Sequence, residues 1–584
     1  MPTLQWIGKD KVINHHQDVP LRVLDRTYGF NDSGEHSDDN GSENKIIHGD
    51  NLEALKALLP EYEGRVSCVY IDPPYNTGNE GWVYNDNVND PRIRKWIGEV
   101  VGVEGEDLSR HDKWLCMMYP RLRLLQKLLA DDGIIFISID DNECASLKFV
   151  CDEIFGASCF VSDISWQRTY STRNDSKGIV NEVEHILAYG KKPDWQPNKL
   201  PRTPEMNARY RNPDNDVSLW RPDNAYAPGA STHQGMVYAI QHPFTGELLY
   251  PTPGRCWTFQ QDYMLECMRG WCEYELRDIG DEERRAMICG VDQSDVRPGV
   301  KSIMLVQSLE ASRTQATKRL KHGPWPRLYF SKDGYGGIAR KTYLDNKSGP
   351  PPTNLWLYDA VGHTDEATKE LKSIFEGRSP FDTPKPTRLV ERILQIATNK
   401  DAIVLDSFAG SGTTAHAVLN ANKADGGNRS FILVEMMDYA EGITAERVKR
   451  VIDGYGEGKK AVEGTGGSFS FYELGEPMFT EDGNLNEAVG TERIRAYVWY
   501  SETGRAYQPS GEANPYHLGN SNGIGYYFYY EPETATTLDY SFLATIKDKQ
   551  DGYVIYADMC TISDDELAEF GITFKKIPRD IARL

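Results

Sequence analysis

The chain has 584 residues and a formal net charge of -22, with 39% hydrophobic and 26% charged residues. This composition is typical of a globular protein large enough for about three or four domains. It has no apolar run long enough to cross a bilayer, no apolar signal-peptide centre near its start and no CxxC pair among its ten cysteines, so we expect a cytoplasmic protein without disulfides or a metal site.

The charge is distributed unevenly along the chain. Residues 191–350 hold 23 basic and 19 acidic residues, and within them residues 301–350 hold ten basic and three acidic residues. The negative total argues against a nucleic-acid partner, because phosphate groups require local positive charge. The basic segment is therefore either a solvated surface or a polyanion-binding module on an acidic body.

The first part of the chain leads into an alternating pattern of strands and helices. We expect residues 1–44 to form an N-terminal arm, ending in a mobile linker that is rich in polar and turn residues. In residues 45–190, short apolar runs that suit buried strands alternate with segments of helical periodicity. This alternation predicts a doubly wound, mostly parallel sheet of Rossmann-like α/β class with helices on both faces.

One predicted strand ends in an unusual loop. The apolar run at residues 68–71 is followed directly by Asp72, Pro73, Pro74 and Tyr75. The two prolines cannot continue a strand ladder, and a surface turn rarely needs both of them together with an aromatic residue. We therefore interpret this stretch as an active-site loop rather than a tight surface turn.

The alternation stops at residues 191–360, which are rich in Pro, Gly, Trp and Tyr and predict an irregular inserted domain. Its aromatic residues lie among basic ones, which suits base stacking and phosphate contact, although such aromatics can equally form the core of a small domain. We take Arg327, Arg340 and Lys341 as its candidate DNA-binding residues.

The pattern resumes at residues 361–460. A short strand at residues 402–405 runs into a glycine turn, Asp406 to Thr414, that opens a helix, and the next strand ends on Glu435. A turn of this kind binds a cofactor in doubly wound folds, because glycine lets the ligand approach the backbone and the helix N-terminus favours negative charge. The pattern suits a nicotinamide cofactor and S-adenosylmethionine equally well. We expect residues 468–584 to form a separate, acidic α+β module.

Together these motifs resemble a known family. DPPYNTGN, DSFAGSGTT and the insertion between them resemble the β class of amino DNA methyltransferases, in which the catalytic motif precedes the cofactor motif. IDPPYNTGNE, KWLCMMYPRLRLL, GIIFISIDDNE, FDTPKPTRLVERIL and ILVE are similar, more closely, to the modification (Mod) subunits of type III restriction-modification systems. The resemblance spans residues 45–190 and 361–460 and implies that the insertion is a target recognition domain.

The resemblance implies site-specific methylation of N6 of an adenine in double-stranded DNA, with S-adenosylmethionine as methyl donor. The lone pair of the adenine amino group is delocalised into the ring, so hydrogen-bond acceptors must localise it. Asp72 and the carbonyl of Pro73 would accept its two hydrogens. Tyr75 would stack on the base, which must flip out of the duplex to be reached. No metal is needed for this reaction.

The resemblance also implies which residues bind the cofactor. Asp50 would lie at the adenine end, Glu435 would hold the ribose, and the glycine turn would line the methionine part. The full set is Asp50, Lys385, Asp406, Phe408, Gly410, Gly412, Thr413 and Glu435. A turn residue and a solvated lysine are the plainer interpretations of Asp50 and Lys385. The implied partners are double-stranded DNA, a second copy of the chain and a helicase-nuclease restriction subunit, since the chain has no helicase or nuclease motif of its own.

Three alternatives remain open at this point. An NAD-dependent oxidoreductase would use the same glycine turn but has no use for the Asp72 loop. A non-enzymatic DNA-recognition subunit would carry the methyltransferase fold as a vestige. An enzyme of the same chemistry could act on N4 of cytosine, on RNA or on a protein amide, although the family's N4-cytosine enzymes usually carry Ser where this chain has Asp72.

Overall fold

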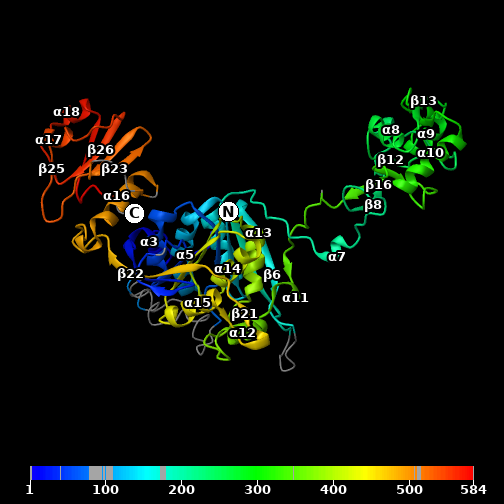
Figure 1. Cartoon of the computed structure of the whole chain (residues 1–584). Coiled ribbons are helices and arrows are strands. Elements are labelled where there is room, and N and C mark those ends of the chain that lie inside the picture. Colours follow the sequence, from blue (N-terminus) through cyan, green and yellow to red (C-terminus); the bar gives the residue numbers. More distant parts are fainter. Residues whose placement is uncertain are drawn as a thin grey trace. The chain divides into compact units, whose positions relative to one another are not determined.

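The computed structural model describes residues 3–39, 41–77, 95, 99, 110–170, 179–345, 347–505, 507–508 and 514–582. The chain divides into two compact units, one formed by Met1–Asn198 with Pro351–Leu584 and the other by Lys199–Pro350 (Figure 1). Residues 78–80, the end of the IDPPYNTGNE motif, lie outside the described residues. No helix in the described ranges is both long and apolar enough to span a membrane.

The first unit is built on an 11-stranded sheet in the order β17-β6-β7-β5-β4-β18-β19-β3-β22-β1-β2. The neighbours from β5 to β22 are all parallel, which confirms the predicted doubly wound, mostly parallel sheet. The parallel strands are β5 (Leu129–Ile139), β4 (Val66–Ile71), β18 (Ile403–Asp406), β19 (Ser430–Glu435), β3 (Lys45–His48) and β22 (Ser468–Pro477). The remaining strands are β6 (Phe160–Gln167), β7 (Val183–Gly190), β17 (Leu355–Trp356), β1 (Arg22–Asn31) and β2 (Gly34–His36).

The pairing of β4 with β18 brings the two halves of the sequence together. Cys68 lies opposite Val404, and Val69 lies opposite Leu405, in a parallel register. Since parallel neighbours end at the same edge of a sheet, the loops that begin at Asp72 and Asp406 must lie side by side. This register positions the site described below.

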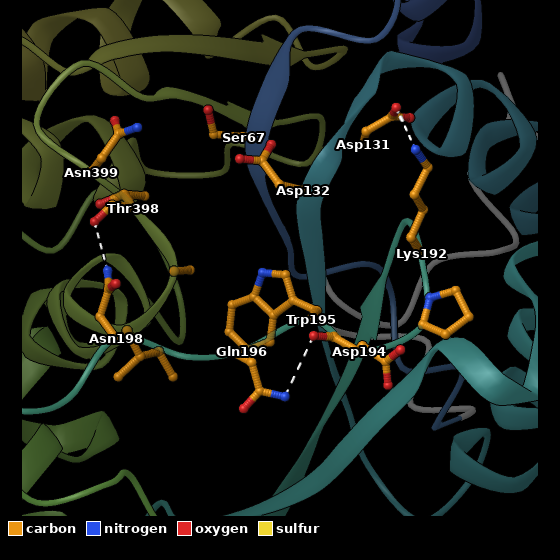
Figure 2. A pocket seen from close by; sticks show the side chains of 13 residues that line it. Ser67, Asp131, Asp132, Lys192, Asp194, Trp195, Gln196, Asn198, Thr398 and Asn399 are labelled. Atoms are coloured by element: carbon orange, nitrogen blue, oxygen red, sulfur yellow. Dashed lines mark hydrogen bonds and ion pairs between the residues drawn. The ribbon is translucent and has the colours of Figure 1, made fainter.

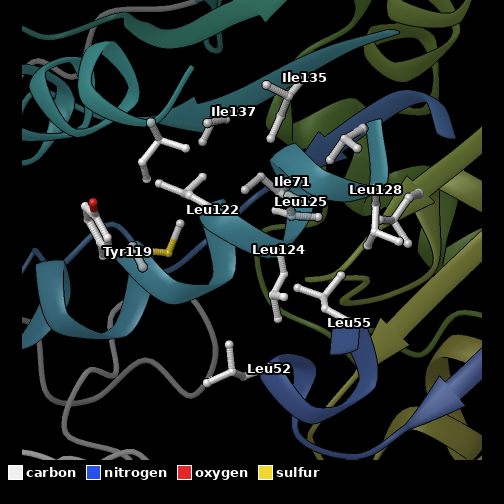
Figure 3. Packing of buried hydrophobic residues seen from close by; sticks show 14 of the residues in the cluster. Leu52, Leu55, Ile71, Tyr119, Leu122, Leu124, Leu125, Leu128, Ile135 and Ile137 are labelled. Atoms are coloured by element: carbon white, nitrogen blue, oxygen red, sulfur yellow. The ribbon is translucent and has the colours of Figure 1, made fainter. Parts of the chain in front are cut away.

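Helices cover the sheet with largely apolar faces. Figure 3 shows leucines of α5 packed with Ile71 of β4, with Ile135 and Ile137 of β5, and with leucines of α3. Leu122, Leu125 and Leu128 are fully buried, so α5 holds β4, the strand that leads into Asp72, from one face. The helices of this unit up to residue 460 are α1 (Lys9–Val12), α2 (His15–Asp18), α3 (Asn51–Tyr62), α5 (Arg110–Leu128), α6 (Cys144–Cys151), α11 (Tyr358–Val361), α12 (Thr364–Ile374), α13 (Thr387–Ala397), α14 (Thr413–Asp425) and α15 (Glu446–Asp453).

The structure differs from the sequence prediction at both ends of this unit. Strand β1 lies in the predicted N-terminal arm (residues 1–44), and β22 opens the predicted C-terminal module (residues 468–584), yet the two pair with each other in the main sheet. Aromatic side chains explain the pairing, since the Tyr28 and Phe471 rings stack with centroids 5.2 Å apart. The remainder of the module has its own sheet of β23 (His517–Ser521), β24 (Ile524–Phe528), β26 (Gly552–Ala557) and β28 (Ile572–Lys576), with α16 (Thr491–Thr503), α17 (Tyr540–Leu543) and α18 (Asp564–Glu569).

The second unit is a small α+β body inside the predicted insertion of residues 191–360. Many of its aromatic residues, including Trp257, Trp271 and Phe330, are buried in one hydrophobic core. These residues therefore form the core of a small domain, which was the alternative to base stacking. Its sheets contain β10 (Ile240–Gln241), β11 (Leu248–Leu249), β13 (Tyr274–Arg277) and β14 (Ser302–Leu305), and β8 (Trp220–Asn224), β15 (Leu328–Phe330) and β16 (Ile338–Tyr343). Its longer helices are α8 (Gln261–Arg269), α9 (Glu282–Cys289) and α10 (Leu309–His322).

The prediction that Lys341 binds DNA is wrong. Its side chain is fully buried, and its ammonium donates to the carboxylates of Asp214 and Asp216 and to the carbonyl of Trp325 at 2.7 Å. A buried ammonium with three acceptors cannot reach a phosphate group. The neighbouring Arg340 is partly buried and pairs with Asp223 at 3.0 Å.

Lys341 should instead matter for stability. Replacing it with Ala leaves the buried carboxylates of Asp214 and Asp216 uncompensated, which should cost the second unit about 3–5 kcal/mol. Hydrogen exchange across residues 199–350 of the full chain would measure the loss of protection. Lys318→Ala is the matched control, because it removes the same charge from the exposed surface of the same unit. Equal protection in the two variants would contradict the structural role of Lys341.

Candidate active site

A pocket lies where β4 and β18 end. It is lined by the loop after β4, by the glycine turn after β18 and by the segment that precedes α13. Six of the residues predicted from the sequence line it, namely Asp72, Lys385, Asp406, Phe408, Gly410 and Thr413. The parallel register of β4 and β18 therefore places the Asp72 loop and the glycine turn around the same pocket.

A larger pocket lies at the other ends of the strands. Figure 2 shows Ser67, near the start of β4, with Thr398 and Asn399, which precede β18, around a cavity of about 440 Å³. An ion pair of 2.5 Å between Lys192 and Asp131 lies at the surface there. Ligands of open α/β sheets bind at the carboxyl ends of the strands, and none of the predicted site residues lines this cavity. The smaller pocket is therefore the candidate active site.

The centre of that pocket is an ion pair between Lys385 and Asp72. The Lys385 ammonium lies 2.8 Å from each oxygen of the Asp72 carboxylate, and the two residues are 313 positions apart. The lysine side chain is only 7% exposed, so it is not the solvated lysine of the plainer interpretation. Its carbonyl also accepts a hydrogen bond from the hydroxyl of Thr413 at 3.4 Å. Lys385 thus contacts both the catalytic loop and the first residue of α14.

Burial and charge oppose each other in this pair. Burial raises the pKa of Asp72, and the Lys385 ammonium acts in the opposite direction. Burial by itself would lower the pKa of Lys385, but the carboxylates of Asp72 and Glu184 raise it above its ordinary value. The lysine therefore stays charged and favours the ionised form of Asp72, which is the form that can only accept hydrogen bonds.

Glu184 of β7 is a site residue that the sequence analysis missed. One of its oxygens accepts a hydrogen bond from the Tyr75 hydroxyl at 3.0 Å and lies 3.7 Å from the Lys385 ammonium, and the other pairs with Arg168 at 2.8 Å. The negative charges of Asp72 and Glu184 are thus compensated by the positive charges of Lys385 and Arg168 around Tyr75. The sequence signal was an acidic residue near the start of a mostly apolar strand, VEHILAYG. Acidic residues are rarely fully buried unless their charge is paired.

The rest of the loop after β4 is anchored by residues of α5 and by Glu143, next to α6. The Pro74 carbonyl accepts a hydrogen bond of 2.6 Å from the indole of Trp114 on α5, and Pro73, Pro74 and Tyr75 are all buried. Asn76 adopts a left-handed conformation with φ of 61° and donates to the carboxylate of Glu143, next to α6. The loop is therefore held rigidly, and the ring of Tyr75 packs with the Lys385 ammonium 4.9 Å from its centroid.

The glycine turn is held in a conformation that side chains disfavour. Gly410 and Gly412 have φ values of 53° and 80°, and a Cβ on Gly412 would lie 3.0 Å from the Thr444 carbonyl. Glu435, 2% exposed at the end of β19, accepts the amide of Gly410 at 2.8 Å and that of Met437 at 3.0 Å. The residue predicted to hold a ribose thus also fixes the turn.

Asp406 is a strongly perturbed acid of the pocket. Burial raises its pKa to about 7, although hydrogen bonds from the Thr414 hydroxyl at 2.5 Å and the Phe408 amide at 3.0 Å oppose the shift. Asp72 and Glu435 add to it, because their negative charges disfavour another one. Strongly shifted acids in a cleft are typical of functional sites.

Asp50 is one of the predicted residues that are absent from the pocket lining, together with Pro73, Pro74, Tyr75, Gly412 and Glu435. Its carboxylate caps α3 by accepting the amides of Leu52 and Glu53, and it pairs with Arg121 at 3.3 Å. It does not line the pocket. These contacts are those of a strand-end turn residue, and its role at the adenine end of a cofactor stays a prediction.

Comparison with known proteins identifies the family. The family model described as DNA methylase, of the N6/N4 methyltransferases, matches residues 66–446, which include both loops of the pocket. The chain belongs to the N6/N4 DNA methylase family. Membership excludes the oxidoreductase interpretation of the glycine turn and accounts for the Asp72 loop beside that turn.

Individual relatives agree with the family match. The chain is 34% identical to the type III restriction-modification enzyme StyLTI Mod subunit of Salmonella typhimurium, over 74% of this chain and 57% of that one. It is 29% identical to the EcoPI Mod subunit of Escherichia phage P1, over 74% and 63% of the two chains. It is 30% identical to the type II methyltransferase M.KpnI of Klebsiella pneumoniae, over 67% and 80%. The chain thus spans less than two thirds of the length of these type III relatives.

The shifted pKa of Asp406 predicts a pH-dependent effect of Asp406→Asn. The folded chain binds this proton more tightly than an unfolded one, whose ordinary pKa is 3.8, so the wild type loses stability through Asp406 as the pH rises from about 4 to about 7. The uncharged variant should escape this loss, gaining on the order of a few kcal/mol relative to the wild type across that window. Urea unfolding of both proteins between pH 4 and pH 8 measures the difference. If the difference in unfolding free energy between the two proteins does not change with pH, the pKa of Asp406 is not raised in the folded chain, and the prediction is wrong.

Proposed function

We propose that this chain transfers a methyl group from S-adenosylmethionine to N6 of an adenine in double-stranded DNA, as the modification subunit of a type III restriction-modification system. The observation that carries the proposal is the meeting of Asp72 with the glycine turn in one pocket, at the carboxyl ends of adjacent parallel strands. Membership of the DNA methylase family gives this pocket its chemistry.

The glycine turn fits the proposed cofactor. Gly410 and Gly412 leave the backbone free of side chains, α14 begins at Thr413, and the buried carboxylates of Asp406 and Glu435 offer acceptors for the hydroxyl and ammonium groups of the cofactor. When bound, S-adenosylmethionine would supply an electrophilic methyl group. The residues around Asp406 would hold its polar parts, and Phe408 supplies an apolar wall.

Asp72 would act on the amino group of the base. Lys385 and Tyr75 occupy part of the hydrogen-bonding capacity of the Asp72 carboxylate. A carboxylate has about four lone-pair sites, so one would remain to accept an N–H of the adenine. The carbonyl of Pro73 would accept the other hydrogen, so that the nitrogen lone pair is localised and aimed at the methyl donor. Because Lys385 favours the ionised form of Asp72, this acceptor is available despite its burial.

Tyr75 would receive the flipped base. Extrusion of a nucleotide costs on the order of a few kcal/mol, which stacking against an aromatic ring helps to recover. The hydrogen bond from its hydroxyl to Glu184 fixes the edge of the ring. Glu184 and Arg168 would thus act as positioning residues for the stacking platform.

Methylation of cytosine at N4 is the second candidate reaction, because the matched family comprises both N6 and N4 enzymes. The acidic Asp72, where the N4 enzymes usually carry Ser, supports adenine. The interpretation of the chain as a vestigial DNA-recognition subunit is disfavoured, since Asp72, Lys385, Gly410 and Glu435 are all retained and joined by hydrogen bonds and ion pairs.

The proposed partners follow from the names of the relatives. The StyLTI and EcoPI relatives are called Mod subunits of restriction-modification enzymes. We therefore propose that a helicase-nuclease restriction subunit binds this chain and that the chain forms homodimers. The second unit would recognise the target sequence. Its exposed Arg327, which lies over the Phe259 ring at 4.9 Å, and the partly exposed Arg340 remain candidates for contact with DNA.

The proposed reaction predicts one modified nucleoside. The full chain, incubated with mixed-sequence duplex DNA and labelled S-adenosylmethionine, should produce N6-methyladenine, measured by mass analysis of the digested DNA. Asp72→Ala should reduce transfer by at least about 100-fold, the scale at which loss of a positioned catalytic group is felt, while cofactor binding is largely kept. N4-methylcytosine as the product would overturn the assignment of the base, and normal transfer by Asp72→Ala would overturn the mechanism.

A further inference from the structure

Three metal-ligating side chains meet on the sheet beside the active site. Cys144 at the start of α6, Asp163 of β6 and His185 of β7 bring a thiol, a carboxylate and an imidazole together, with all ligand atoms within 4.8 Å of one another. Because successive strand residues point to opposite faces, His185 lies on the face of β7 opposite Glu184 of the pocket. The cluster is therefore separate from the methyl-transfer site.

The imidazole of His185 is oriented by two carboxylates. Its Nδ1 lies 3.0 and 3.1 Å from the two oxygens of Asp163, and its Nε2 lies 3.0 Å from an oxygen of Asp141, which follows β5. Metal-binding histidines commonly donate their second N–H to a carboxylate, which fixes the tautomer and frees the other nitrogen for the metal. Asp141 is placed to play that part, leaving Nδ1 to face Cys144 and Asp163.

We propose that Cys144, Asp163 and His185 bind a zinc ion, with Asp141 as the outer carboxylate. A thiolate and an imidazole select zinc over calcium or magnesium, which prefer oxygen ligands. Three protein ligands leave the fourth tetrahedral position for water. The side chain of Asp163 is 41% exposed, so the ion can enter from solvent. The ligands are spread over 42 sequence positions, which is why the absence of CxxC pairs led to the expectation of no metal site.

Without a metal, the same residues would form simple ion pairs between His185 and the two aspartates. The Cys144 thiol would then only hydrogen-bond His185, whereas a bound ion makes the affinity for Zn²⁺ depend on that thiol. A bound ion would link α6, β6 and β7, and β7 carries Glu184. The site would then stabilise the strand that positions Tyr75 through Glu184.

Zinc titration of the full chain tests the proposal. The purified protein, freed of metal by a chelator, is titrated with Zn²⁺ in competition with a chromophoric chelator. Wild type should bind one ion per chain. Cys144→Ser should lower the affinity by more than about 100-fold, and Asp141→Asn should lower it by about 10- to 100-fold, the range typical of an outer carboxylate. Cys267→Ser, another partly exposed cysteine, is the matched control and should bind as the wild type does.

Cobalt provides a readout that does not depend on the variants folding. Co²⁺ in the wild-type site should show a thiolate-to-cobalt charge-transfer band, and addition of Zn²⁺ should abolish it. Saturating Zn²⁺ should also raise the melting temperature of the wild type but not that of Cys144→Ser. A wild type that binds no Zn²⁺, a Co²⁺ complex without a thiolate band, or equal Zn²⁺ affinity in Cys144→Ser and Cys267→Ser would each overturn the site.

Discussion

The ion pair between Lys385 and Asp72 is the interaction on which the pocket depends. Removing two charges from water is costly, and the mutual attraction offsets the cost only where geometry and further hydrogen bonds are good. Here both carboxylate oxygens lie 2.8 Å from the ammonium, and Glu184 with Arg168 provides a second pair nearby. The cluster holds the Asp72 loop against the glycine turn, so the same contact that closes the fold also opposes the rise in the pKa of Asp72 that its burial causes.

Parallel pairing allows the two loops to be far apart in sequence. Once β4 and β18 are neighbours, the inserted unit of residues 199–350 can vary in length without moving the ends of those strands. The chain leaves the first unit at residue 198 and returns at residue 351, and the Asn198 amide is held by the Ile396 carbonyl at 2.8 Å. An inserted unit attached in this way can change its own surface, and with it the proposed DNA specificity, while the pocket stays intact.

Local patterns in the sequence predicted the parts of the fold that local physics determines. Strand and helix periodicity gave the parallel sheet, and the prolines and glycines marked the two loops, because these residues restrict or extend backbone conformation wherever they occur. The predicted site residues that line the pocket belong to those loops or to the DTPKP stretch before α13.

Partners of side chains could not be predicted in the same way. Lys341 looks like any surface lysine in sequence, and only the fold brings Asp214 and Asp216 to it from more than 120 positions away. Glu184, the pairing of β1 with β22 and the cluster around His185 likewise depend on contacts between distant segments. Long-range contacts of this kind leave no periodic signal.

The coupling between Asp72 and Lys385 tests the account most directly. A double-mutant cycle with Asp72→Asn, Lys385→Met and the double variant would be measured as the opening free energy of the amides of β4 and β18, by native-state hydrogen exchange. If the pair joins the two halves, the double variant should be less destabilised than the sum of the single variants by at least about 1 kcal/mol. Single effects that add within about 0.5 kcal/mol would show that the two residues act independently, and would contradict the account.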